Sequence, residues 1–170
     1  MTRVGWMMTT CCAVLFVGAS ALFSPVPKVI WNASASVPIG LYVVKPADAL
    51  HIGELVVVTP PEAVASFLAE RGYLARGAPL LKRVLALPGQ AVCRTGRTIT
   101  VDGMTLGDAL DRDQLGRLLP DWQGCRIVAD SEAFLMNWQS TNSFDGRYFG
   151  PISASTIVGR AVPLWTKEDN

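Results

Sequence analysis

The chain begins with a long run of apolar residues. No charged side chain occurs from Val4 to Phe23, and about 20 apolar residues are enough to cross a bilayer as a helix. Arg3 precedes the run and Lys28 follows it, so the flanking charges favour one orientation only slightly. We predict a membrane anchor over residues 1–25, with the N-terminus inside the cell and the rest of the chain outside.

Two other interpretations of this run stay open. Ala19, Ser20 and Ala21 resemble the small-residue site at which a secretory signal peptide is cut, and a buried core helix is the other alternative. The length of the run, without a pronounced basic stretch before it, favours a retained anchor. Pro25 and Pro27 then predict an extended connector, because proline disfavours a continuing helix.

The rest of the chain alternates short strand-like segments with turn residues. Five segments rich in β-branched and aliphatic residues are bounded by Gly or Pro: 41–44, 54–59, 81–87, 97–101 and 156–164. One helix is predicted from Pro61 to Arg71, with Gly72 as its stop. The pattern predicts a mainly β domain over residues 26–170, with a folded or barrel-like sheet and one or two short helices.

A polar segment interrupts this pattern. Gly107–Asp121 carries six charged side chains and only a few leucines. We expect an exposed insertion over about residues 104–124, with room for a short helix, tethered at its base by Cys93 and Cys125. A solvated surface loop without a catalytic role is favoured over a substrate lid, because such loops are common on any domain.

Charge and cysteines narrow the classes of function. The formal net charge is +1 and no long run of Lys or Arg occurs, which argues against nucleic acid as a partner. Cys93 and Cys125 lie in the exported part, where disulfides persist, and closing the loop between them would contribute roughly 3 to 4 kcal/mol. Neither their spacing nor the single His51 fits a zinc site, so we expect no metal and no cofactor.

Two serines and one lysine are the candidates for chemistry. Ser34 and Ser36 precede a Pro-x-Gly turn, where serines are ordinary capping residues, and a serine hydroxyl needs a base to become a nucleophile. His51 has no evident acidic partner nearby in the sequence. Lys82 lies in an apolar strand-like run, where burial would lower its pKa toward neutrality. An edge-strand lysine that only blocks aggregation is the alternative.

Three ordered segments carry a resemblance to a known family. Residues 36–42 (SVPIGLY), 82–89 (KRVLALPG) and 142–151 (NSFDGRYFGP) resemble successive boxes of the type I signal peptidases. The sequences of these segments are most similar to the conjugative-transfer, TraF-type branch, whose nucleophile box has the sequence Ser-x-Pro-x-Gly-Leu-Tyr. The Gly-Asp-Asn sequence usual before the third box in general signal peptidases is replaced by Met136-Asn137-Trp138, as expected for that branch.

The first two boxes imply the catalytic groups. Ser36 matches the nucleophile, Lys82 the general base, and Arg83 the basic residue that follows the lysine. Ser34 occupies the place from which some members lend a hydroxyl to the oxyanion hole, alongside the Ser36 amide. Capping or plain solvent exposure is the alternative for Ser34.

The third box implies support for those groups. Ser143 matches the serine that orients the lysine, and Asp145 matches an aspartate that pairs with nearby arginines. Arg83 and Arg147 are its candidate partners. Without the resemblance, the Asp145-Gly146-Arg147 sequence would indicate a turn with a surface ion pair.

The resemblance implies a signal-peptidase-like fold and a serine endopeptidase that acts by acyl transfer in the bacterial inner membrane, with its catalytic domain periplasmic. Its expected partners are an exported protein substrate, in particular a pilin-like subunit of a conjugative or type IV secretion system, membrane lipid around the N-terminal helix, and other transfer-apparatus proteins. The alternatives are a housekeeping signal peptidase and a non-catalytic membrane-tethered β scaffold.

Overall fold

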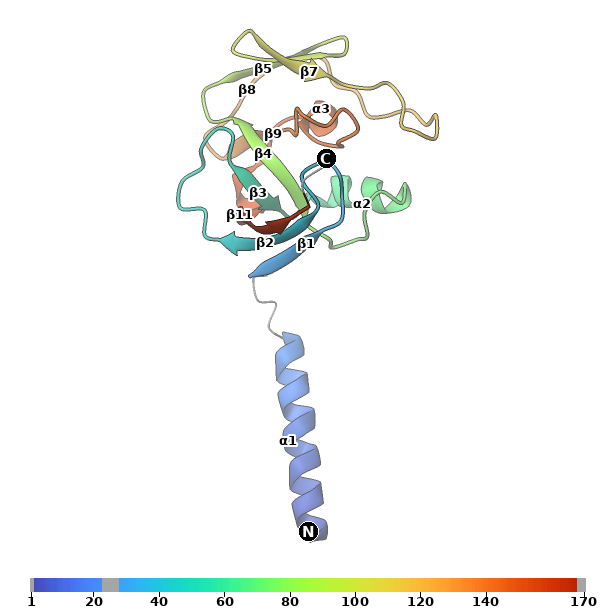
Figure 1. Cartoon of the computed structure of the whole chain (residues 1–170), viewed down its shortest axis with the longest axis vertical. Helices are drawn as coiled ribbons and strands as arrows, with labels where there is room; N and C mark the ends of the chain where they lie inside the picture. The colour runs from blue at the N-terminus through green and yellow to red at the C-terminus, as the bar shows by residue number, and fades with distance from the viewer. Residues whose placement is uncertain (1, 23–27, 168–170) are drawn as a thin grey trace.

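The computed structural model describes residues 2–22 and 28–167 (Figure 1). It consists of an N-terminal helix and a mainly β domain with two antiparallel sheets, which confirms the prediction of a mainly β domain with few helices. The connector expected at Pro25 and Pro27 lies outside the described residues, as does part of the segment 1–25 predicted to be an anchor.

Helix α1 comprises Arg3–Leu22 and extends away from the β domain (Figure 1). Its apolar side chains do not enter the core: Val14, Leu15 and Phe16 are between 65% and 80% exposed. The interpretation of this segment as a buried core helix is therefore wrong. Within the described part of the chain, no helix combines the length and the apolar character that a membrane span needs.

The larger sheet has seven strands in the order β1-β2-β11-β3-β4-β9-β10. The strands are β1 Val29–Asn32, β2 Gly40–Lys45, β3 Leu55–Val58, β4 Leu80–Ala86, β9 Glu132–Leu135, β10 Ile152–Ser153 and β11 Ile157–Thr166. The predicted strands near residues 41, 54, 81 and 156 correspond to β2, β3, β4 and β11. The sequence did not predict β1, β9 or β10.

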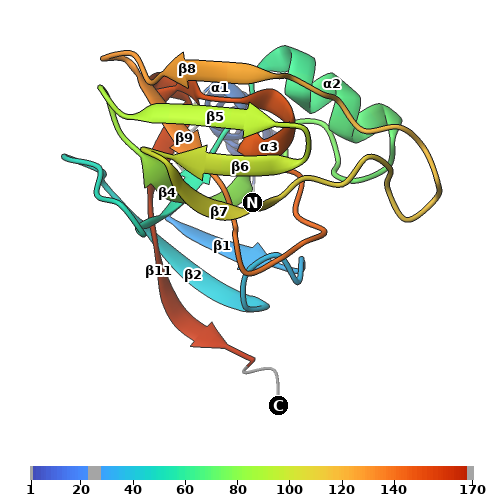
Figure 2. The ribbon, with the colours of Figure 1, turned by 90° about the horizontal axis from the view of Figure 1, so that it is seen from above.

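The smaller sheet has four strands in the order β7-β6-β5-β8, seen side by side in Figure 2. They are β5 Ala91–Thr95, β6 Thr98–Val101, β7 Met104–Asp108 and β8 Gly124–Ile127. Cys93 and Cys125 lie opposite each other on β5 and β8 and form the expected disulfide. The bridge therefore joins two neighbouring strands of this sheet.

The core of the larger sheet lies on both faces of β3. All four β3 residues are buried, and successive side chains point to opposite faces. Val57 packs with Leu81 in one apolar cluster, and Val56 packs with Val84 in another. An uninterrupted apolar strand is typical of such a position, and its neighbour β4 is the strand that carries Lys82.

Two glycines allow β11 to cross its neighbours closely. A Cβ atom at Gly40 would overlap the carbonyl oxygen of Trp165, and one at Gly159 would overlap the carbonyl oxygen of Lys45. The register of β11 also shifts once against β2 and once against β3. Such irregularities bend a strand, and the sheet curls as a result.

Helix α2, Glu62–Glu70, connects β3 to β4 close to the predicted bounds. It buries Ala65 and Leu68, and Gly72 follows it with a φ of +69°, a conformation that favours glycine after a helix. The short helices α3, Gly146–Phe149, and η1, Ala154–Thr156, flank β10.

The segment expected as an exposed insertion is partly built into the domain. Its first five residues form β7, and Ala109 is fully buried. The described chain forms no helix from residue 109 to 123, so the expected short helix is not made. The Asp113 side chain instead accepts hydrogen bonds from the amides of Leu115 and Arg117, which stabilises a turn in place of a helix.

Candidate active site

Ser36 lies in the loop that joins β1 to β2. Its side chain is partly exposed, whereas the next residue, Val37, is buried in a cluster with Tyr42. The Tyr42 hydroxyl donates a hydrogen bond to the carbonyl oxygen of Pro38 at 2.6 Å. The turn after Ser36 is therefore fixed to the core, and the serine is held at the domain surface.

Asn32, the last residue of β1, organises this loop. Its Nδ2 donates to the carbonyl oxygens of Ser34, Val37 and Pro38 at 2.8, 3.1 and 3.1 Å. Its Oδ1 accepts from the Ser34 amide at 3.1 Å. One buried side chain thus satisfies four backbone groups around Ser36. The sequence reasoning missed this residue, although an asparagine two positions before a serine is a common start of such a turn.

Ser34 contacts the candidate nucleophile directly. Its Oγ donates to Ser36 Oγ at 3.0 Å and accepts from the Ser36 amide at 3.3 Å. The two groups that the resemblance assigns to an oxyanion hole are therefore neighbours. In this structure, the Ser34 hydroxyl accepts a hydrogen bond from the Ser36 amide, the second group assigned to the oxyanion hole.

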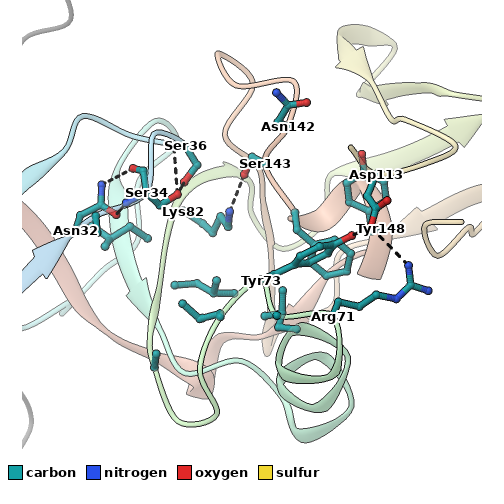
Figure 3. A pocket seen from close by; sticks show the side chains of 18 of the residues that line it. Asn32, Ser34, Ser36, Arg71, Tyr73, Lys82, Asp113, Asn142, Ser143 and Tyr148 are labelled. Carbon is teal, nitrogen blue, oxygen red and sulfur yellow. Dashed lines mark hydrogen bonds and ion pairs between the residues drawn. The ribbon is translucent and has the colours of Figure 1, made fainter. Parts of the chain in front are cut away.

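Lys82 enters the site from β4. This strand lies between β3 and β9, so the alternative of an edge-strand lysine is wrong. The side chain is only 3% exposed, and its Nζ donates to Ser143 Oγ at 2.6 Å (Figure 3). A buried ammonium with a neutral partner loses much of its hydration.

This burial lowers the pKa of Lys82 to about 8. The Asp145 carboxylate acts to raise this pKa, and the Arg147 guanidinium acts to lower it. Burial is the largest of the three effects and outweighs the opposing effect of Asp145, because burial disfavours the charged form of an amine. About half of the Lys82 side chains are then neutral at pH 8, whereas an exposed lysine would be almost entirely charged.

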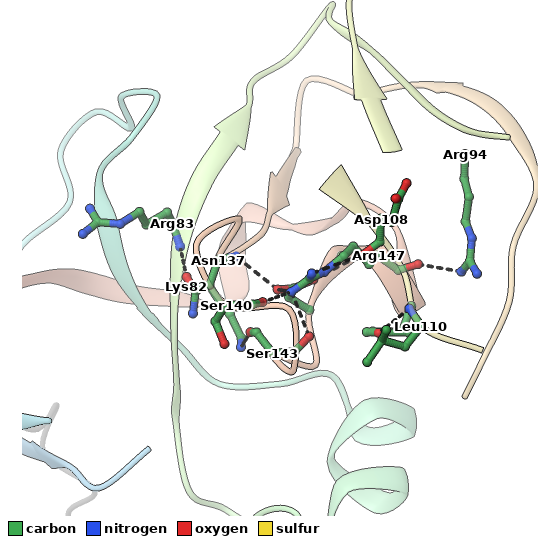
Figure 4. A network of polar contacts seen from close by, with 12 residues as sticks. Lys82, Arg83, Arg94, Asp108, Leu110, Asn137, Ser140, Ser143 and Arg147 are labelled. Carbon is green, nitrogen blue, oxygen red and sulfur yellow. Dashed lines mark hydrogen bonds and ion pairs between the residues drawn. The ribbon is translucent and has the colours of Figure 1, made fainter. Parts of the chain in front are cut away.

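Asp145 and Arg147 form a buried ion pair beside the lysine. The Nε–Oδ1 and Nη2–Oδ2 distances are both 2.9 Å, and the two residues are 0% and 1% exposed. Arg147 Nη2 also donates to the carbonyl oxygens of Ser140 and Ser143 at 2.6 and 3.1 Å (Figure 4). The forked pair is geometrically stiff, and it fixes the loop that carries Ser143.

Arg83 does not take part in this pair, which corrects the expectation that it contacts Asp145. It follows Lys82 in β4, so its side chain points to the opposite face. There it donates to the carbonyl oxygen of Gly53 at 2.9 Å and lies over the ring of Trp138. Its backbone amide donates to Asn137 Oδ1 at 3.1 Å, and the amide of Asn137 in turn donates to Asp145 Oδ2 at 3.1 Å.

One cavity of about 800 Å³ is lined by Ser34, Ser36, Lys82 and Ser143. Figure 3 shows these side chains entering it from the β1–β2 loop, from β4 and from the loop before α3. Among the described residues, Nζ of Lys82 donates a hydrogen bond to Oγ of Ser143, and Oγ of Ser36 accepts one from Oγ of Ser34. No hydrogen bond joins Ser36 to Lys82 in the described part of the chain, although both residues line the same cavity.

The opposite wall of the cavity comes from the loop after β7. The Asp113 carboxylate accepts a hydrogen bond from Arg117 Nε at 2.6 Å. It also accepts one from the Tyr73 hydroxyl, which connects this loop to the segment that follows α2. Burial acts to raise the pKa of Asp113, but the hydrogen bonds from Tyr73 and Arg117 outweigh it and hold the pKa well below its ordinary value. The segment expected as a solvated loop thus supplies part of the cavity wall.

His51 lies outside this cavity. Its side chain is 73% exposed and 3.9 Å from Glu54, which also pairs with Arg160. In residues 2–22 and 28–167, no three His, Cys, Asp or Glu residues gather closely enough to hold a metal ion.

The arrangement combines a serine hydroxyl and a buried amine with a lowered pKa in one cavity. A serine needs a base to take its proton, and a lysine held neutral by burial is one known solution. The Ser36 amide and the Ser34 hydroxyl are donors of the type that stabilise an oxyanion. The site is therefore equipped for acyl transfer.

Residues 1–165 match the family described as "Signal peptidase, peptidase S26". Plasmid transfer protein TraF of Escherichia coli is 37% identical over 164 residues, covering 91% of this chain and 90% of that protein. Conjugal transfer protein TraF of Agrobacterium fabrum strain C58 is 38% identical over 147 residues, covering 79% and 81%. Probable signal peptidase I-1 of a Synechocystis species is 31% identical over 112 residues, covering 66% and 53%.

Proposed function

This chain belongs to the S26 signal peptidase family, and on that premise we propose that it is a serine endopeptidase with Ser36 as nucleophile and Lys82 as general base. The observation that carries the proposal is the burial of Lys82 beside Ser143 in the cavity that Ser36 lines. An amine with a pKa of about 8 can accept a proton near neutral pH, as a general base must.

The reaction begins when the neutral Nζ of Lys82 moves from Ser143 toward Ser36 and takes its hydroxyl proton. Ser36 Oγ attacks the peptide carbonyl carbon, and the oxygen of that carbonyl becomes an oxyanion held by the Ser36 amide and the Ser34 hydroxyl. Protonated Lys82 then gives its proton to the leaving amine. A water molecule, or an amine of the same substrate, attacks the acyl-enzyme and releases Ser36.

Ser143 and the Asp145–Arg147 pair have positioning roles in this proposal. Ser143 Oγ holds Nζ at 2.6 Å, and Arg147 holds the backbone of Ser143. A catalytic group that is kept in place loses less entropy on reaching the reactive geometry. The buried pair also places one charge of each sign near the lysine, so their effects on its pKa oppose each other.

The proposed substrate is an exported protein with small residues before the cut. The names of two relatives, a plasmid transfer protein and a conjugal transfer protein, support a pilin-like subunit of a conjugative or type IV secretion system. Other proteins of that apparatus are further partners in this proposal. Similarity to a probable signal peptidase I-1 supports a housekeeping signal peptidase as the second candidate.

We place the protein in the bacterial inner membrane, with α1 among the lipids and the β domain in the periplasm. Two observations support this placement. Apolar side chains of α1 such as Val14, Leu15 and Phe16 are exposed and do not pack into the domain core. The Cys93–Cys125 disulfide is typical of a protein in an oxidising compartment.

Co-expression with a pilin-like precursor, followed by intact mass measurement, tests the proposal. Ser36→Ala and Lys82→Ala should each reduce cleavage by about a thousandfold or more, because the two groups act as one unit. Exposed Ser155 and Lys45 provide matched controls as Ser155→Ala and Lys45→Ala. Cleavage that persists in folded Ser36→Ala would exclude the nucleophile assignment, and a scaffold would support pilus assembly in both variants without any cleavage.

A further inference from the structure

We propose that Arg71 forms a carboxylate-binding subsite in the wall of the cavity that Ser36 and Lys82 line. The ligand would be an acidic side chain or the free carboxyl terminus of the bound peptide. The inference rests on the proposed function, because the peptide is the substrate of that same site.

Arg71 is held in place without the use of its N–H groups. It ends helix α2 as the residue after Glu70 and lines the cavity. Its guanidinium lies 4.7 Å from the centre of the Phe67 ring, a favourable cation–π distance. Its carbonyl oxygen accepts from Arg117 Nη2 at 3.2 Å. The guanidinium is therefore positioned by a ring and by its own backbone.

This guanidinium has a buried nitrogen that makes no hydrogen bond with the described residues. Its Nη1 is shielded from solvent and has no hydrogen-bond partner. The Oδ2 atom of Asp113 lies 3.8 Å from Nη1, which is longer than a charge-assisted hydrogen bond. Buried donors usually have partners, and the side chain as a whole is still 25% exposed. Arg71 therefore has spare donors at the cavity wall.

The charge balance of this wall favours an anion. Asp113 already accepts from Tyr73, from Arg117 Nε and from two backbone amides. It is the one carboxylate among the described residues that line the cavity, whereas Arg71 and Arg117 supply two guanidinium groups. Two guanidinium groups therefore share one carboxylate, which leaves a net positive charge at this wall. A carboxylate with two oxygens matches the forked geometry of arginine.

A row of aromatic rings connects this wall to the catalytic end of the cavity. Phe144 follows Ser143, and its ring stacks on the rings of Tyr148 and Phe67 with 5.0 Å between ring centres in each pair. The guanidinium of Arg71 lies over the Phe67 ring. Figure 3 shows Tyr73 and Tyr148 between the Lys82–Ser143 contact and Arg71. A peptide with its reacting carbonyl at Ser36 can therefore lie along apolar rings and end at a cation.

Two sets of labelled decapeptides provide the probes. One set carries a single Glu, moved along an otherwise Ala and Gly sequence, with Gln at the same position as its match. The other compares a free with an amidated carboxyl terminus. Binding is measured by fluorescence anisotropy on the full-length Ser36→Ala chain in detergent, and cleavage is measured on the wild-type chain.

We expect one Glu position, or the free terminus, to bind roughly tenfold more tightly than its neutral match. Arg71→Gln should abolish this preference. Arg71→Lys should retain part of it, because lysine keeps the charge and loses the fork. Arg76 is the matched control: it lies in the same α2–β4 connection, pairs with Glu62 on the surface and is 63% exposed. Arg76→Gln should keep the full preference.

The inference is overturned if no peptide shows the preference, or if folded Arg71→Gln or Arg71→Lys binds with the full wild-type preference. A purely structural Arg71 would lower the melting temperature and leave the ratio of Glu to Gln binding unchanged, and Arg71→Lys supplies this comparison if Arg71→Gln does not fold. The proposed function fails separately, if wild type cleaves none of the peptides while the Ser36→Ala chain still prefers the carboxylate.

Discussion

Lys82 is a basic residue at a buried position of a mostly apolar strand. Leu81 and Val84 beside it are buried, and the strand has a partner on each side. The same burial that destabilises the ammonium also produces a base with a pKa of about 8. Activity and stability should therefore both depend on the protonation of this one group.

Peptide cleavage should rise with pH through about 8, by about tenfold per unit below that value. Asp145→Asn should move this rise to lower pH, because the Asp145 charge acts to raise the pKa of Lys82. Asp111→Asn is the control, since the Asp111 side chain is 65% exposed and its carboxylate lies 3.9 Å from Arg97. An unchanged profile in folded Asp145→Asn would contradict the assignment of Lys82 as the titrating base.

The stability of the folded chain should follow the same group with a definite sign. The pKa of Lys82 is about 8 in the folded protein and 10.5 as an ordinary lysine. Between these values the unfolded chain binds more protons, so stability rises with pH across that window. The unfavourable contribution, roughly 3 kcal/mol, is complete below pH 8 and vanishes above 10.5. Urea unfolding at several pH values should show that the free energies of unfolding of wild type and Lys82→Met become more similar as pH rises.

Much of the site could be predicted at the level of residues, because three ordered boxes specify which side chains meet. Ser36, Lys82 and Ser143 do line one cavity. The proposed contact of Arg83 with Asp145 failed because adjacent strand residues face opposite ways. Asn32 was missed because its role depends on three carbonyl groups that only the folded loop brings together.

The β1–β2 loop is an element whose shape depends on one side chain. Asn32 provides the four hydrogen bonds that keep the backbone around Ser36 in place. Asparagine is suited to this task because its amide both donates and accepts. Aspartate in the same place would keep the bond from the Ser34 amide and would repel the three carbonyl oxygens.

Asn32→Asp should therefore lower the free energy of unfolding by about 2 to 4 kcal/mol and reduce cleavage by displacing Ser36. Urea unfolding and peptide cleavage measure the two effects. Asn142 is exposed and lines the same cavity, so Asn142→Asp adds the same charge without disturbing the loop. Equal losses in the two variants would argue that charge, and not the lost hydrogen bonds, is responsible.

At the level of elements, strands with continuous apolar sequence could be predicted and short or exposed ones could not. β3 is buried on both faces, which leaves a clear sequence signal. β8 is exposed throughout, and β10 has only two residues. The contribution of the loop after β7 to the cavity wall was missed, because Asp113 looks like a solvated charge until Tyr73 and Arg117 are placed beside it.

The whole molecule separates into a helix without core contacts and a β domain with its own core. Among the residues whose burial the structure describes, the buried apolar ones belong to the domain, in clusters that include residues of both sheets. The domain should therefore fold without α1, whereas attachment to a membrane should depend on α1 alone.

Deletion of residues 1–27 should leave thermal stability and peptide cleavage within about twofold of the full chain, because surface changes away from the core have small effects. The truncated protein should appear in the soluble fraction, and carbonate extraction should leave the full-length protein in the membrane. A truncated protein that still sediments with membranes, or that is unfolded, would contradict the independence of the two parts.

The short connection between α1 and the site also limits where the enzyme can act. Only 14 positions separate Leu22 from Ser36, and a fully extended chain of that length spans no more than about 50 Å. If α1 lies in the bilayer, as proposed, Ser36 has to stay within this distance of the membrane. Cleavage would then depend on the distance of the cleavage site from the membrane as well as on its sequence. A suitable sequence held farther from the membrane than Ser36 can reach would remain uncut.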